Sequence, residues 1–264
     1  MFRSVRVRCE DHRMEHAKAA VRRVFSNLDT RFKGEGGAPT GVPSLDAAGG
    51  LQAGELAVLA GHPGVGKTSM AVSIATHTAT ADGDVLWISL AETATQTAER
   101  MLNHQACVQP LALRRGEVQR QDMTNLTYAA ATISKWSLHI EDAIDLTAAG
   151  IRERAREWRA IATSRRALIV VDYLQLLADD CASAAVLRSL LGTAKEASAA
   201  VLLVSQHLAD AHERATLESI ATAVVYLRAD VHVHEILLAK HRYCQTPQTE
   251  EVVFEGSTFA TPAS

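Results

Sequence analysis

The residues with the most specific chemistry form a glycine-rich run that ends in a lysine and a threonine. The run reads Gly61-His62-Pro63-Gly64-Val65-Gly66-Lys67-Thr68, fits the pattern G-x-x-x-x-G-K-[ST], and leads into a predicted helix that starts at Ser69. Glycines let backbone N–H groups turn toward phosphate oxygens, and a helix N-terminus adds a favourable dipole. Lys67 would reach the β- and γ-phosphates, and Thr68 would offer its hydroxyl to Mg²⁺. Residues Gly61–Ser69 are therefore predicted to bind ATP with Mg²⁺.

Two further polar residues stand at the ends of apolar runs. Asp172 closes the run that starts at Ala167, and Gln206 directly follows the run that ends at Ser205. Because parallel strands end at one edge of a sheet, Asp172 is expected beside the phosphate-binding loop, where it would hold Mg²⁺ through water. Gln206 is in a position to sense the γ-phosphate. The structural alternatives are an N-cap of the following segment by Asp172 and a helix N-cap by Ser205.

The elements that must carry these residues are short apolar strands alternating with helical stretches. The predicted strands are Leu56–Ala60, Val85–Ser89, Leu168–Asp172, Val201–Ser205 and Val224–Leu227, with Ile236–Lys240 and Val252–Phe254 as a later hairpin around Pro247. They are rich in Val, Leu and Ile, as in a parallel sheet that is buried on both faces. The alternation predicts an α/β fold with a mostly parallel, twisted sheet flanked by helices.

The N-terminal segment is expected to stand apart from this sheet. Apolar residues recur at helical spacing from Met14 to Leu28, so an amphipathic helix is predicted to end near Asp29. Lys33–Pro39 is rich in glycine and reads as a flexible linker. We therefore expect a helix and linker over residues 1–38 and an ATPase domain over residues 39–264. The helix could fold back on its own domain or dock on a neighbouring subunit.

Composition excludes several classes of protein. The chain has 264 residues, of which 47 % are hydrophobic and 22 % are charged, with a formal net charge of −3. This composition supports a large buried core and excludes a chain that coats nucleic acid by bulk positive charge. No apolar run is long enough to span a membrane. The four cysteines are scattered without C-x-x-C spacing, so a disulfide scaffold is not indicated and a cytoplasmic location is expected.

Several runs resemble the C-terminal RecA-like motor domain of DnaB-type replicative helicases, over roughly Pro39 to Phe254. The most specific is Val170-Val171-Asp172-Tyr173-Leu174-Gln175-Leu176, which is close to the D-Y-L-Q-L-M of that family. Ser205-Gln206 is similar to its S-Q motif, and Lys240-His241-Arg242 is similar to its K-Q-R. The combination distinguishes this family from other RecA-like proteins. The resemblance implies a RecA-like P-loop NTPase fold preceded by a linker helix.

The resemblance also implies an activity and partners. A homo-hexameric ring would hold ATP between neighbouring subunits, hydrolyse it, and move on single-stranded DNA during DNA replication. Lys240 and Arg242 would act on the ATP of the adjacent subunit, with Arg242 as an arginine finger. The helix from Met14 to Leu28 occupies the place of the family's linker helix, which packs on the next subunit. A helicase, primase or loader partner is a further expectation, and no membrane partner is expected.

The chain departs from the family pattern at the end of the second strand. The family has S-L-E there, and its glutamate orients and deprotonates the attacking water, whereas this chain reads Ser89-Leu90-Ala91-Glu92. A gapless match places Ala91 at the glutamate position. Loss of a general base typically lowers a rate by about 10²–10⁴-fold. Glu92 could replace the glutamate if the strand end bulges, because at regular strand geometry it would face away.

Two loops also depart from the pattern. The loop at residues 178–184 is short and contains two aspartates, which would repel DNA phosphates. The segment from His207 to Ala221 is shortened as well, and Arg214 is its only arginine. These departures leave an alternative function open. The chain could be an ATP-binding accessory protein or pseudo-helicase, with weak or no hydrolysis, that regulates or co-assembles with an active helicase.

Overall fold

The computed structural model describes residues 16–32, 36–177, 184–206, 211–229, 234–255 and 258–260. It divides into two compact units, Met1–Gly36 and Gly37–Ser264. The predicted short loop at residues 178–184 therefore lies almost entirely outside the described residues, as does His207. Within the described ranges, no helix combines the length and apolar character that a membrane crossing requires.

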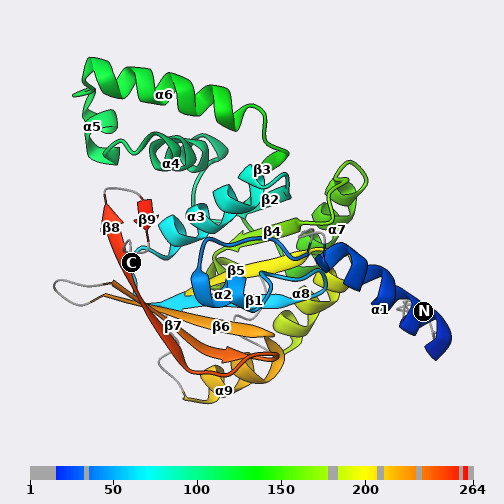
Figure 1. Cartoon of the computed structure of the whole chain (residues 1–264). Coiled ribbons are helices and arrows are strands. Elements are labelled where there is room, and N and C mark those ends of the chain that lie inside the picture. The colour runs from blue at the N-terminus through cyan, green and yellow to red at the C-terminus, as the bar shows by residue number, and fades with distance from the viewer. Residues whose placement is uncertain are drawn as a thin grey trace, which may run out of the picture. The chain divides into compact units, whose positions relative to one another are not determined.

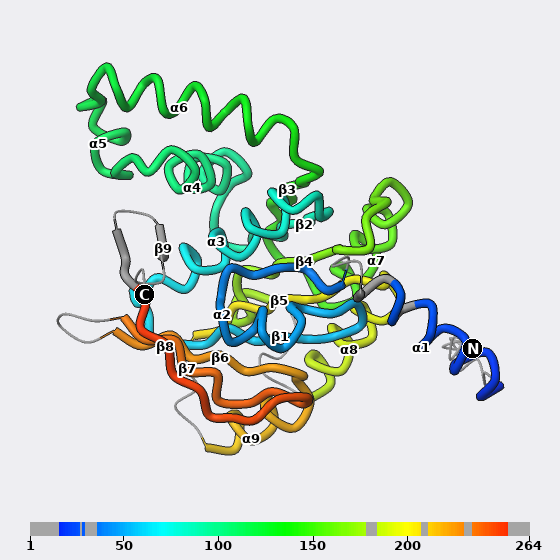
Figure 2. Tube along the Cα trace, viewed as in Figure 1, coloured from blue at the N-terminus to red at the C-terminus, as the bar shows by residue number. Residues whose placement is uncertain are grey.

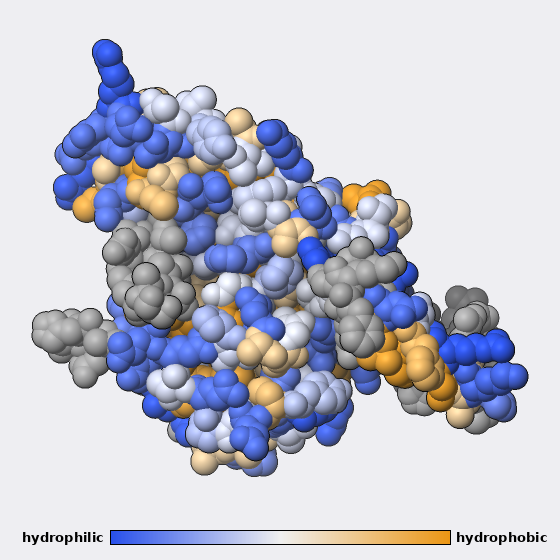
Figure 3. All heavy atoms as spheres, in the orientation of Figure 1, coloured by the Kyte–Doolittle hydropathy of each residue, from blue (hydrophilic) through white to orange (hydrophobic). Residues whose placement is uncertain are grey.

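The first unit contains one described helix, α1 (Ala17–Phe32). It continues past the expected end near Asp29. No glycine or proline, the residues that interrupt helices, occurs between Asp29 and Gly34. Val21, Val24 and Phe25 are 52 %, 55 % and 65 % exposed. Hydrophobic surface is visible over α1 in Figure 3. The helix therefore presents apolar side chains at its surface.

The second unit is an α/β structure built on one nine-stranded sheet (Figure 1). The strands are β1 (Leu56–Gly61), β2 (Asp84–Ser89), β3 (Leu138–Asp142), β4 (Ala167–Asp172), β5 (Ala200–Gln206), β6 (Ala223–Ala229), β7 (His234–His241), β8 (Gln248–Glu255) and β9 (Thr258–Ala260). The helices of this unit are α2 (Pro43–Ala47), α3 (Lys67–Thr80), α4 (Ala94–Ala106), α5 (Pro110–Arg115), α6 (Arg120–Ile133), α7 (Ala148–Arg159), α8 (Ala184–Glu196) and α9 (Ala211–Ile220), and a 3₁₀ turn, η1, spans Leu174–Leu176.

The strand order is β3-β2-β4-β5-β1-β6-β7-β8-β9. Strands β1 to β6 pair in parallel, and β7, β8 and β9 add antiparallel strands at one side. All seven predicted strands are present, and β7 and β8 form the predicted hairpin. β3 and β9 were not predicted. β3 alternates apolar and polar side chains, so it lacks the continuous apolar run that marked the other parallel strands.

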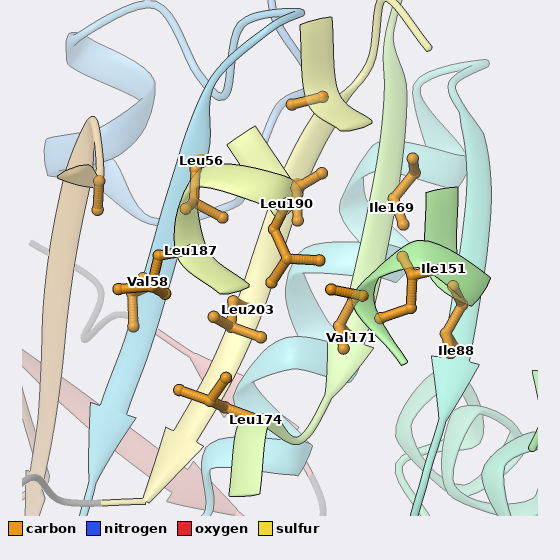
Figure 4. Close-up of a cluster of buried hydrophobic side chains, with 14 of the residues drawn as sticks. Leu56, Val58, Ile88, Ile151, Ile169, Val171, Leu174, Leu187, Leu190 and Leu203 are labelled. Atoms are coloured by element: carbon orange, nitrogen blue, oxygen red, sulfur yellow. The ribbon is translucent and has the colours of Figure 1, made fainter. Parts of the chain in front are cut away.

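The sheet is buried on both faces, which explains the apolar runs of β1, β2 and β4. One hydrophobic cluster joins alternate strand residues to α7, α8 and α9, and a second joins the other strand residues to α3 and the segment around α2. Figure 4 shows the first cluster, in which Leu187 and Leu190 of α8 lie against Val58 and Leu203 of the sheet. These two cores hold the strand ends in fixed positions.

A small helical bundle is inserted between β2 and β3, and Figure 2 traces it as α4, α5 and α6. Thr93 caps α4 in a reciprocal arrangement: its hydroxyl accepts from the Gln96 backbone at 3.2 Å, and the Gln96 side chain accepts from the Thr93 backbone at 2.9 Å. The bundle has its own core of four buried residues: Ala106, Val108, Leu126 and Ala129. Of its three helices, α4 is the one that packs against α3 and β3.

Candidate functional site

Four neighbouring strands, β2, β4, β5 and β1, bring the predicted site residues to one edge of the sheet. Gly61 of β1 pairs with Gln206 of β5, and Ser89 of β2 pairs with Asp172 of β4. A cleft of about 410 Å³ opens at this edge. Its lining residues are Pro63, Gly64, Val65, Gly66, Lys67, Thr68, Ser69, Arg100, Asp172, Tyr173, Val204, Gln206 and His234. The sheet topology therefore joins the phosphate-binding loop, Asp172 and Gln206 in a single cavity.

The phosphate-binding loop has the backbone that its glycines permit. Gly64 and Gly66 have φ angles of +79° and +95°, in the left-handed region that other residues rarely adopt. The Lys67 ammonium is buried and donates a 2.7 Å hydrogen bond to the carbonyl oxygen of His62. Burial lowers the pKa of Lys67, and the nearby charge of Asp172 acts in the opposite direction. Lys67 is thus folded back over its own loop, and its ammonium is hydrogen-bonded to the loop backbone.

Asp172 is the acidic residue of the cleft and is 4 % exposed. The Thr68 hydroxyl hydrogen-bonds to its carboxylate. Its Oδ1 atom is buried, and none of the described residues donates to it. Burial raises the pKa of Asp172 to about 6, with a smaller contribution from the charge of Glu92, and the Thr68 hydrogen bond and the charges of Arg100 and Lys67 act in the opposite direction. An oxygen left without a donor beside a threonine hydroxyl is a donor set that fits Mg²⁺.

Glu92 lies in the turn between β2 and α4 rather than in the strand. The Ser89 hydroxyl fixes this turn, because it accepts from the Glu92 backbone N–H at 3.1 Å and donates to the Glu92 carbonyl at 2.7 Å. The Glu92 carboxylate pairs with Arg100 and is not part of the cleft lining. It lies next to the cleft, because its partner Arg100 lines the cleft. Its charge contributes to the raised pKa of Asp172. Ala91 is exposed and does not line the cleft either.

Lys240 and Arg242 lie away from this cleft, at the end of β7. The Lys240 ammonium donates to the carbonyl oxygens of Glu218 and Ala221, at the C-terminal end of α9. Burial lowers the pKa of Lys240, and the charge of Arg242 lowers it further. Arg242 is exposed, and its backbone N–H donates to the Thr222 carbonyl at 3.0 Å. Neither side chain lines the cleft.

Two other predicted residues, Gly61 and His62, line a separate cavity of about 290 Å³ together with Arg214 and Tyr226. Gly61 ends β1, and a Cβ atom there would come within 2.6 Å of the Leu227 carbonyl oxygen. Gly61 is therefore required for close approach of β6 to the start of the loop, whereas residues 63–69 face the cleft.

Four cleft residues are not among the predicted site residues: Arg100, Tyr173, Val204 and His234. Tyr173 directly follows Asp172 at the strand end, which is a signal the sequence did contain. His234 opens β7, and an antiparallel strand begins at the edge where its partner β6 ends. Arg100 reaches the cleft from α4, and no local pattern in the sequence indicates that direction.

The chain is similar to known proteins of one family. The profile of the DnaB-like helicase C terminal domain matches residues 37–259. The replicative DNA helicase DnaB of Geobacillus stearothermophilus is 28 % identical over 263 residues, covering 86 % of this chain and 58 % of that protein. The replicative DNA helicase DnaC of Bacillus subtilis (strain 168) gives the same identity and coverage. This chain therefore spans about three fifths of the length of these two relatives.

Solved structures show the same fold. One solved ATPase domain superimposes with a TM-score of 0.84 at 22 % identity, covering 95 % of this chain and all of that one. A DnaB-like replicative helicase, described together with its interactions with primase, gives a TM-score of 0.79 at 22 % identity, covering 95 % of this chain and 67 % of that one. The predicted RecA-like α/β fold is thus confirmed.

Proposed function

The chain belongs to the DnaB-like helicase C-terminal domain family, and from that premise we propose that it is the ATP-driven motor domain of a replicative DNA helicase. One observation carries this proposal: the phosphate-binding loop, Asp172 and Gln206 line one cleft at the ends of adjacent strands. The accessory or pseudo-helicase alternative rested on Ala91 and the shortened loops. The matching relatives are named as replicative helicases, which favours the motor.

The cleft residues divide the work of nucleotide binding. Backbone N–H groups of the loop and the Lys67 ammonium would bind the phosphates of ATP, which requires Lys67 to leave the His62 carbonyl. Thr68 and Asp172 would hold Mg²⁺, which supplies charge neutralisation at the β- and γ-phosphates. Gln206, at the end of β5, would sense whether the γ-phosphate is present.

Hydrolysis needs a base for the attacking water, and Glu92 is the proposed base. A water oxygen would bond to the γ-phosphorus while the bond to the β,γ-bridging oxygen breaks, and the water proton would pass to the Glu92 carboxylate. The ion pair of Glu92 with Arg100, which lines the cleft, supports this role because it places the carboxylate next to the cleft. Ala91 has no group that could accept the proton.

The proposed assembly is a homo-hexameric ring with ATP between subunits. Two features support it. The exposed apolar residues of α1 are suited to packing on a neighbouring subunit (Figure 3). Arg242 is exposed and distant from its own cleft, as a residue acting on the adjacent subunit's ATP must be. Single-stranded DNA would be the track, and a helicase, primase or loader would be a further partner.

Steady-state ATP hydrolysis with and without single-stranded DNA tests the proposal. We expect hydrolysis that DNA stimulates, that Lys67→Ala abolishes, and that Glu92→Ala lowers by about 10²–10⁴-fold. Lys135→Ala is the matched control, because Lys135 is exposed and outside the cleft. Tight ATP binding by Lys67→Ala would overturn the site assignment. ATP binding without hydrolysis above the Lys67→Ala background would instead support the accessory alternative.

A further inference from the structure

Glu92 and Arg100 form a two-pronged ion pair. The Arg100 Nε atom lies 2.6 Å from Glu92 Oε2, and Arg100 Nη2 lies 2.5 Å from Glu92 Oε1. Both carboxylate oxygens therefore accept from one guanidinium, in the fork geometry that is specific to arginine. Each carboxylate oxygen keeps a second lone pair, but the guanidinium holds the side chain in place and competes with water for it. The pair as it stands therefore opposes the base role of Glu92.

The two partners differ in freedom of movement. The Glu92 backbone is held at its N–H and carbonyl by Ser89, and Thr93 next to it caps α4. Arg100 projects from the second turn of α4 on a long side chain that is 44 % exposed, against 25 % for the Glu92 side chain. Arg100 is thus the partner that can change position at low cost.

Arg100 stands between two cavities. It lines the nucleotide cleft, and it also lines a larger groove of about 1100 Å³ formed by α4, α5, α6 and Glu92. Of the described residues, it is the one that both linings share. Together with Lys67 and His234 it makes up the basic side chains of the cleft lining, and its charge stabilises ionised Asp172. A guanidinium that lines this cleft while paired to a carboxylate would have a second, more highly charged anion to bind once a nucleotide phosphate entered the cleft.

We propose that Arg100 binds phosphate in the cleft, and that arrival of a nucleoside triphosphate draws its guanidinium from Glu92 onto the phosphate. Glu92 is then released to accept the water proton only when a triphosphate is present. The pair holds the base inactive in the empty or diphosphate-bound cleft. This inference rests on the proposed function, because it assigns how the ATP of that same site controls its own hydrolysis.

Binding measurements on the full chain separate this role from a structural one. Isothermal titration calorimetry would compare β,γ-imido ATP, which is not hydrolysed, with ADP. Arg100→Met is expected to weaken binding of the triphosphate analogue by about tenfold or more, the value of one charge-assisted hydrogen bond, and ADP binding by less than about threefold. Glu92→Gln is expected to strengthen binding of the analogue by about threefold or more, because Arg100 no longer has to leave a carboxylate. Arg114→Met is the matched control, since Arg114 lines the groove but not the cleft.

The opposing outcomes are equally specific. The inference is overturned if Arg100→Met weakens both nucleotides equally or neither, or if Glu92→Gln fails to strengthen binding of the analogue. Arg100→Lys, which keeps the charge but loses the fork, serves if thermal unfolding shows that Arg100→Met does not fold, and the same two-nucleotide comparison then decides. If the unaltered chain binds neither nucleotide, the proposed function fails together with the inference. If Lys67→Ala abolishes binding while the Arg100 variants show no triphosphate preference, the inference alone fails.

Discussion

The side chain of Gln175 forms hydrogen bonds to both Ser205 and Gln206, at the end of the neighbouring strand β5. Its Oε1 atom accepts a 3.0 Å hydrogen bond from the Gln206 backbone N–H, and its Nε2 atom donates a 3.0 Å hydrogen bond to the Ser205 hydroxyl. Gln175 belongs to the 3₁₀ turn that follows Asp172, so one amide couples the ends of β4 and β5. The Mg²⁺ ligand and the γ-phosphate sensor of the proposed site are therefore held at a fixed separation by a residue that lies outside the cleft.

Replacement of Gln175 by leucine is expected to loosen this coupling. The Gln206 N–H and the fully buried Ser205 hydroxyl would both lose a partner, which should lower the free energy of unfolding by about 1–3 kcal/mol. ADP binding should change little, because the phosphate-binding loop is untouched, whereas ATP hydrolysis should fall. Urea unfolding and steady-state kinetics measure the two effects. Gln121→Leu, at an exposed position on α6, should change neither, and an equal loss there would argue against the coupling.

Asp172 should make the protein less stable as the pH rises through the acidic range. Its pKa is raised from 3.8 to about 6 in the folded state, so the folded protein disfavours the ionised form. The free energy of unfolding should fall between about pH 4 and pH 6, by up to about 3 kcal/mol from this group. Urea unfolding without Mg²⁺ across this range tests it, with Asp172→Asn as comparison. A constant difference between the two proteins at every pH would contradict the prediction.

The same carboxyl should govern the pH dependence of Mg²⁺-assisted nucleotide binding. Mg²⁺ requires ionised Asp172, so the strengthening of ADP binding by Mg²⁺ should decline below about pH 6, approaching tenfold per pH unit. Titrations of ADP with Mg²⁺ and with EDTA at each pH isolate this effect from protonation of the nucleotide itself. Asp172→Asn should show little strengthening by Mg²⁺ at any pH. Strengthening that persists in that variant would assign the metal to other ligands.

Substitution of Lys240 should lower the stability of the fold, whereas substitution of Arg242 should abolish ATP hydrolysis. Lys240→Met removes the donor from the end of α9 and should lower the free energy of unfolding by about 1–3 kcal/mol. Arg242→Met should change stability by less than about 0.5 kcal/mol, because the side chain is exposed, yet abolish hydrolysis. Urea unfolding and steady-state hydrolysis of the two variants measure these effects.

A mixing experiment tests the action of Arg242 on the adjacent subunit. Arg242→Met subunits keep an intact cleft, and Lys67→Ala subunits keep an intact Arg242. Rings assembled from both should recover part of the hydrolysis that neither variant shows alone. No recovery, despite assembly of mixed rings, would argue that Arg242 does not act across the interface.

The parts of the molecule that were predictable from sequence are those with a local signature. The seven apolar runs each became a strand, because a strand buried on both faces needs continuous apolar sequence. The loop at Gly61–Ser69 was visible from its glycines and Lys67, and the position of Asp172 followed from parallel strand ends. β3 was not predicted because polar residues interrupt and end its apolar sequence. The predicted end of α1 is too early because helix ends carry a weaker signal than helix interiors.

What sequence could not supply was the direction of long side chains. Arg100 meets Glu92 across the N-terminal cap of α4, from a position eight residues along the chain. Lys240 reaches the carbonyls of α9 across a distance of about twenty residues in the chain, and that contact depends on tertiary packing. His234 enters the cleft through the antiparallel addition of β7, which periodicity alone does not reveal.

The inserted helices have a small core that is separate from the two large cores of the sheet. The two sides of the nucleotide cleft should therefore differ in local stability. The phosphate-binding loop follows the central strand β1, which both large cores protect. In contrast, α6 packs in the small cluster that it shares with the end of α4 and with Val108, and no residue of α5 is buried. Amide hydrogen exchange should therefore be slowest in β1, β4 and β5 and fastest in α5 and α6. α4 should exchange at an intermediate rate, since Met101 also anchors it to the sheet. The backbone around Arg100 should therefore open more often than the backbone around Lys67. One side of the cleft would be rigid and the other would undergo local opening.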